Sequence, residues 1–261
     1  MPTLNAQVVY QGLTIKYHTS KPPTPVQQMK LHASYQLAKT MFGKVISEIT
    51  AIRTAIKQNP FANSVSPLTR KILVHHFHLA EGKDKAAMEQ LSTDLGKILS
   101  VYRATKTGLD GPMVISDAYA SVLRKQNRGI MGATADRGYV SARRDHSQPA
   151  KASGLFPRFD PDLAGGTKYS TGLKGSVHID FDLLLSDSKL SIARTIIHES
   201  THKFRDTEDH AYAWYHQSNV NGTPYNQLTK AEAMDNADSF AYAAVCVYKK
   251  KLLTGPINTL S

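Results

Sequence analysis

The chain has 261 residues, of which 41% are hydrophobic and 20% charged, proportions that are ordinary for a soluble globular protein. No apolar run approaches the roughly 20 residues needed to cross a bilayer, so no membrane span is expected. The single cysteine, Cys246, excludes an intrachain disulfide framework and fits synthesis in a reducing compartment. The formal net charge of +11 admits a nucleic acid or an acidic partner, but the basic residues are spread along the chain and favour a solvated surface.

The first 27 residues read as a strand segment followed by a proline-rich linker. Apolar residues alternate between positions 4 and 17, which predicts a strand or two, and "SKPPTP" at 20–25 stops regular structure. The N-terminus lacks a basic start followed by an apolar stretch, so we expect synthesis in the cytoplasm without a secretory signal.

Three helices are predicted next, because apolar residues recur at three- and four-residue spacing over 26–57, 68–79 and 83–104. The second ends in "VHHFH", whose His75 and His78 share a helix face. They are either a secondary metal site or ordinary helix histidines. Residues 125–175 are rich in Gly, Ser, Arg and Lys and predict loops and short strands.

A strand, a helix and a last helix follow this region. The stretch "GSVHIDFDLL" at 175–184 alternates apolar and polar residues, which predicts a half-buried strand with one polar face. N-cap candidates at 186–188 then precede an apolar helix face beginning at Leu190. The last helix is expected over 229–252.

The sequence His198-Glu199-Ser200-Thr201-His202 falls late in the helix that begins near Leu190. Residues four apart lie on one face of a helix, so both imidazoles can point at one ion. Glu199 lies about 100° round the helix from His198, where it can take a proton from a water beside the ion. The pattern predicts one catalytic Zn²⁺ ion in an enzyme that hydrolyses peptide bonds.

A catalytic zinc usually has three protein ligands, so the third must come from elsewhere. The extended pattern HExxHxxGxxH fails, because Arg205 and Glu208 stand where it requires glycine and histidine. Asp206 shares the helix face but would lie nearly in line with the histidines. Asp209, beyond the helix, comes from another direction and suits a tetrahedral site better. Glu232, from a later helix, is the alternative for a gluzincin-type peptidase.

The segments "HESTH", "TEDHAY" and "NADSFAYAA" together resemble the aspzincin metallopeptidases, the group of deuterolysin and the lysine-specific metalloendopeptidases. The resemblance implies a zincin-like α+β fold over residues 28–252, helix-rich with a small twisted sheet and an active-site helix carrying HExxH. Residues 253–261 are then a C-terminal tail. The roles it implies are zinc ligands at His198, His202 and Asp209, a general base at Glu199 and an oxyanion donor at Tyr212.

The substrate side of the site follows from the same resemblance. Asp238 would lie near the pocket for the residue after the scissile bond, where the family often prefers a basic side chain. Ala241 stands where lysine-specific members carry glutamate, which argues against strict lysine selectivity. The strand at 176–183 would be the edge strand along which an extended protein or peptide substrate pairs. His178 on that strand either touches substrate or faces solvent.

Peptidases of this chemistry usually act outside the producing cell, whereas this chain shows no signal. We therefore expect a delivered bacterial effector or toxin, exported by a dedicated secretion system, with a cognate inhibitor or a secretion partner. Two other classes are weighed against the enzyme: a noncatalytic zinc-stabilised binding protein, and a basic nucleic-acid-associated protein.

Overall fold

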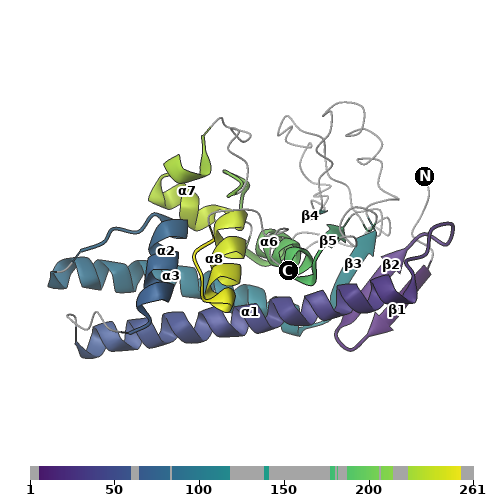
Figure 1. The fold of residues 1–261 in the computed structure, drawn as a ribbon, viewed down its shortest axis with the longest axis horizontal. Coiled ribbons are helices and arrows are strands. Elements are labelled where there is room, and N and C mark those ends of the chain that lie inside the picture. The colour runs from purple at the N-terminus through teal and green to yellow at the C-terminus, as the bar shows by residue number, and fades with distance from the viewer. Residues whose placement is uncertain are drawn as a thin grey trace, which may run out of the picture. The chain divides into compact units, whose positions relative to one another are not determined.

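A computed structural model of the chain describes residues 6–59, 65–82, 84–117, 138–140, 177–179, 181, 187–205, 207–213 and 223–253. The described residues form an α+β structure with long helices and a small sheet (Figure 1). Two compact units divide the chain, and both are assembled from separate stretches of sequence. The first unit comprises residues 1–35 and 108–206, and the second comprises residues 36–107 and 207–261.

The first unit is built on a five-stranded sheet with the strand order β1-β2-β3-β5-β4. Gly12, with a φ of 77° that suits glycine, turns the chain between the antiparallel strands β1 and β2. Strand β2 pairs in parallel with β3, β3 in parallel with β5, and β5 antiparallel with β4. The strand bounds are β1 Ala6–Tyr10, β2 Leu13–Tyr17, β3 Met113–Asp117, β4 Gly138–Val140 and β5 Val177–Ile179.

The predicted strand at 176–183 appears as β5, but its expected place at the sheet edge is wrong. Ile179 is paired with Asp117 of β3 on one side and with Gly138 of β4 on the other. Strand β5 therefore has no free edge for an added peptide, and the edge beside it belongs to β4. Alternation of side chains fixes the faces of a strand, but it cannot reveal how many neighbours pair with its backbone.

Helix α6, Lys189–Arg205, carries the histidine motif and lies against β4 and β5 in the first unit (Figure 1). Its start is capped by Ser188, whose Oγ accepts from Ser191 N–H at 3.2 Å. Residues 190–202 are buried apart from Arg194. A helix buried almost all round is a rigid mount for functional side chains.

The second unit is helical and takes in most of α1, Pro25–Gln58, and of α3, Lys85–Asp110, with α2, Pro67–Phe77, and two C-terminal helices. The three predicted helices are confirmed, because their apolar stripes form the core: Met41, Phe42, Val45, Ile49, Leu91, Leu95, Ile98 and Tyr102 are at most 3% exposed. Tyr102 O–H also donates to the Phe240 carbonyl at 2.9 Å, which ties α3 to the last helix.

The single helix expected over 229–252 is instead two helices, α7 Lys230–Asp235 and α8 Ala237–Lys249. The break falls at Asn236, whose backbone is extended (φ −87°, ψ 119°). Thr229 and Glu232 form a reciprocal capping box at the start of α7. Helical periodicity continued through 236 in the sequence, so the pattern did not reveal an interruption that tertiary hydrogen bonds impose.

The α+β class with a helix-rich chain and a small sheet is confirmed, whereas the zincin-like assignment stays a prediction. Strands β1 and β2, from the N-terminal segment, belong to the same sheet as β3 and β5. Within the described residues, every helix is too short or too polar to cross a bilayer.

Candidate metal centre

His198 and His202 lie one turn apart on α6 and turn their imidazoles toward each other. Their Nε2 atoms are 3.1 Å apart, and both residues are 6% exposed. Two neutral imidazole nitrogens approach this closely either by sharing a proton or by binding one cation. Bonds of about 2.0–2.1 Å to a tetrahedral zinc would put two ligand nitrogens about 3.3 Å apart. The spacing of this pair therefore suits a shared zinc ion.

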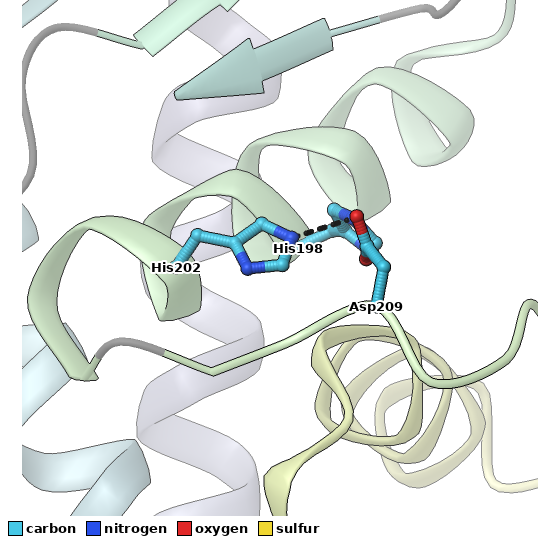
Figure 2. A group of neighbouring side chains, drawn as sticks. All are labelled: His198, His202 and Asp209. Carbon is cyan, nitrogen blue, oxygen red and sulfur yellow. Dashed lines mark hydrogen bonds between the residues drawn. The ribbon is translucent and has the colours of Figure 1, made fainter. Parts of the chain in front are cut away.

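Asp209 follows seven residues after His202 on the segment beyond the helix and completes a group of three. Its carboxylate oxygen and the two imidazole nitrogens all lie within 4.8 Å of one another. Figure 2 shows the three side chains converging, with the dashed line joining the two histidines. Among the described residues this is the one such group of three or more histidine, cysteine or acidic side chains. Two imidazoles and a carboxylate are ligands that zinc commonly takes, so the donor set fits.

Glu199 is placed beside the histidine pair by the helix itself. Its Oε1 lies 3.9 Å from His198 Nε2, and the side chain is buried with its residue only 4% exposed. A carboxylate at this distance is too far for a hydrogen bond to that nitrogen but close enough to share a bound water.

The segment 207–213, which carries Asp209 and Tyr212, is fixed within the second unit by the junction between α7 and α8. Glu208 forms a parallel bridge with Asn236, with Glu208 N–H donating to the Asp235 carbonyl at 2.8 Å. Tyr212 lies three residues after Asp209 and is partly buried. The backbone of the segment that carries Asp209 is therefore held at the "NAD" motif, residues 236–238.

Asn236 and Asp238 both turn into this segment from the junction. The amide of Asn236 accepts from His210 N–H and Ala211 N–H, each at 3.0 Å, and donates to the Ala211 carbonyl at 2.8 Å. Asp238 Oδ2 accepts from Ala213 N–H at 2.7 Å, and the residue is 1% exposed. The sequence reasoning missed Asn236, although an asparagine, a poor helix former, in the middle of the predicted helix was the signal available.

His178 is buried in β5, with 1% of its surface exposed. The expectation that it faces solvent is therefore wrong, since alternation along the strand does not show whether another part of the chain covers its polar face. Contact between His178 and a substrate stays a prediction.

Glu232, the alternative third ligand, belongs to the capping box of α7. Its Oε2 accepts from the N–H and the Oγ1 of Thr229, both at 2.8 Å, and these bonds lower the pKa of its carboxyl. The carboxylate of Glu232 therefore makes hydrogen bonds at the start of α7. Among the described residues, Asp209 is the acidic residue grouped with the histidines.

The "VHHFH" histidines, in the second unit, differ in their burial. His76 is buried, with Nδ1 2.8 Å from Tyr225 Oη and Nε2 3.4 Å from Cys246 Sγ. His75 is exposed and His78 partly buried. Within the described part of the chain none of the three joins a group of three metal-ligating side chains, which favours their reading as ordinary helix histidines.

Comparison with protein-family models, with curated proteins and with solved structures found no match to this chain. The resemblance to a peptidase family therefore stays a prediction from its motifs, and the function must be argued from the site itself.

Proposed function

We propose that the protein is a zinc-dependent metalloendopeptidase with His198, His202 and Asp209 as the metal ligands. The observation that carries the proposal is the convergence of these three side chains within 4.8 Å next to a buried glutamate. The resemblance of "HESTH", "TEDHAY" and "NADSFAYAA" to the aspzincin peptidases and their zincin-like fold supports the same conclusion.

A zinc ion held there would act as a Lewis acid and lower the pKa of a water near it. Glu199 takes the proton from the attacking water and passes it to the leaving amine, which conserves the proton over the reaction. Tyr212 donates a hydrogen bond from its phenolic O–H to the oxygen of the peptide carbonyl as negative charge develops on that oxygen. The burial of Glu199 and both histidines keeps bulk water away from these steps, which strengthens every charge interaction in the site.

The test is cleavage of an unfolded protein by the full chain loaded with zinc, with and without a chelator. Glu199→Gln keeps the size of the side chain but removes its basicity, so hydrolysis should fall by about 10²- to 10⁴-fold. Bound zinc should stay at one ion per chain, measured by atomic emission. Glu81→Gln, at an exposed position, is the matched control and should keep full activity. Full activity of Glu199→Gln would refute the mechanism.

The noncatalytic alternative makes a different prediction in the same assay. A zinc-stabilised binding protein would bind the ion at His198 and His202 but show no chelator-sensitive cleavage of any unfolded protein. The buried carboxylate 3.9 Å from a ligating nitrogen favours the enzyme, since a purely structural zinc site has no use for a base there.

Substrate preference and delivery extend the proposal. A basic residue after the scissile bond is the expected preference, to be read from the cleavage sites in a peptide library. We also propose that the enzyme acts as an exported bacterial effector with a cognate inhibitor. Detection of the protein in culture supernatant, lost when the secretion system is disabled, tests this.

A further inference from the structure

The segment 207–213 contains neither helix nor strand, yet it holds both the third ligand and the oxyanion donor of the proposed site. Its backbone is held by hydrogen bonds to residues 235–238 on both sides of Asp209. Ahead of Asp209, Glu208 N–H donates to the Asp235 carbonyl at 2.8 Å, and the Glu208 carbonyl accepts from Ala237 N–H at 3.0 Å. A loop needs such bonds to hold a side chain in one place, because nothing in its own backbone pattern does so.

Asn236 supplies the bonds directly after Asp209. Its Oδ1 accepts from two successive backbone N–H groups, those of His210 and Ala211, and its Nδ2 donates to the Ala211 carbonyl. The remaining donor reaches Ser239 Oγ at 3.1 Å. With 0% of its surface exposed, the amide uses both its acceptor and its donors within the unit. This one side chain thus makes hydrogen bonds to three backbone groups of the segment.

Asp238 supplies the bond that follows Tyr212, through its 2.7 Å contact with Ala213 N–H. Its charge strengthens the bond, because hydrogen bonds to an ionised acceptor are shorter and stronger than neutral ones. Asp238 has 1% of its surface exposed, so water does not compete for this bond. Together the two side chains bracket Asp209 and Tyr212.

We propose that Asn236 and Asp238 are positioning residues that set the zinc affinity and the turnover of the site through Asp209 and Tyr212. This inference rests on the proposed function, since it requires Asp209 to be a zinc ligand. The physical reason is that a ligand held in advance loses little conformational freedom when the ion binds. A ligand on a freely moving loop must lose that freedom at the moment of binding.

Zinc affinity, measured by competition with a chromophoric chelator, tests the role of Asn236. Asn236→Ala should weaken zinc binding by about 10- to 100-fold, the usual effect of removing a group that orients a metal ligand. Asn236→Asp keeps both accepted bonds and loses both donated ones, so its affinity should fall between those of the wild type and Asn236→Ala. If Asn236→Ala does not fold, the zinc affinity of Asn236→Asp alone tests the role of Asn236.

A structural role without effect on the metal is excluded by matched controls. Ile49→Val and Ile49→Ala truncate a fully buried residue of α1 in the same unit and bracket the loss of stability expected for the asparagine variants. They should bind zinc as the wild type does. The second control is Asp209→Ala, in which Asn236→Ala should cause no further loss of zinc affinity because the residue it positions is gone.

Asp238 is tested by comparing Asp238→Ala with Asp238→Asn. The asparagine can still accept from Ala213 N–H, so it should restore most of the zinc affinity and kcat lost in the alanine variant. A residue that recognises a basic substrate would behave differently: both variants would bind zinc normally, and both would lose activity on basic substrates through a higher KM.

The outcomes separate this inference from the proposed function. Absence of zinc from the wild-type protein, or full zinc affinity in Asp209→Ala, would refute the proposed ligand set. Loss of zinc in Asp209→Ala with wild-type affinity in Asn236→Ala, Asn236→Asp and Asp238→Ala would leave the ligand set standing and overturn the positioning role.

Discussion

His76 provides a test of the fold that is independent of the metal site. The side chain is buried between Tyr225 and Cys246, and burial lowers its pKa from 6.5 to about 3. Repulsion from His75 and His78 lowers it as well, while the charge of Asp238 opposes the shift. His76 is therefore neutral in the folded protein at every pH at which the protein is normally handled.

The sign of the effect follows from proton counting. Between pH 6.5 and about 3 the unfolded chain binds a proton at His76 and the folded chain does not, so stability falls as the pH falls through this window. At pH 5 the unfolded histidine is about 97% protonated, which lowers the free energy of unfolding by about 2 kcal/mol relative to pH 7. The value at pH 5 hardly depends on how far below 5 the folded pKa lies.

Urea unfolding at pH 7 and pH 5, followed by circular dichroism, measures this difference. A chelator keeps both samples free of metal, so that protonation of metal ligands is common to every variant. His76→Asn removes the titrating group but keeps an amide near Tyr225 Oη, and it should lose about 2 kcal/mol less than the wild type between the two pH values. His75→Asn, at an exposed position, is the matched control and should change the pH dependence much less. Equal pH dependence of the wild type and His76→Asn would refute the reasoning.

Three further predictions concern single side chains. Tyr212→Phe should lower kcat by about 10²- to 10³-fold, the usual effect of removing an oxyanion donor, without changing zinc stoichiometry; unchanged kcat in steady-state assays would remove Tyr212 from the mechanism. Glu232→Ala should lose the capping box of α7 and a little thermal stability yet keep one zinc per chain, whereas loss of zinc by atomic emission would move the third ligand from Asp209 to Glu232. Cys246, with its thiol pKa raised by burial to about 11, is about 1 in 10,000 thiolate at pH 7, so iodoacetamide should label it only after unfolding, and rapid labelling of the native protein, seen by mass spectrometry, would contradict its burial.

The sequence by itself was enough to predict the first three helices and the residue types of the proposed ligands. The apolar stripes of α1, α2 and α3 were readable because helical periodicity and burial agree along them. The spacing of His198, Glu199 and His202 fixes their relation on any helix, so the local half of the site needed no tertiary information.

Tertiary structure decided what the pattern left open. Whether β5 lay at the edge or in the middle of its sheet depended on the pairing of strands far apart in the chain, and alternation is blind to that. The same holds for the break at Asn236, since the bonds that interrupt the helix run to residues 25 and 26 positions earlier. Asp206 lies outside the residues that the structure describes, and among the described acidic residues it is Asp209 that lies beside the two histidines. Spacing along a helix determines which of its side chains share a face, whereas long-range hydrogen bonds determine which segments of the chain come together.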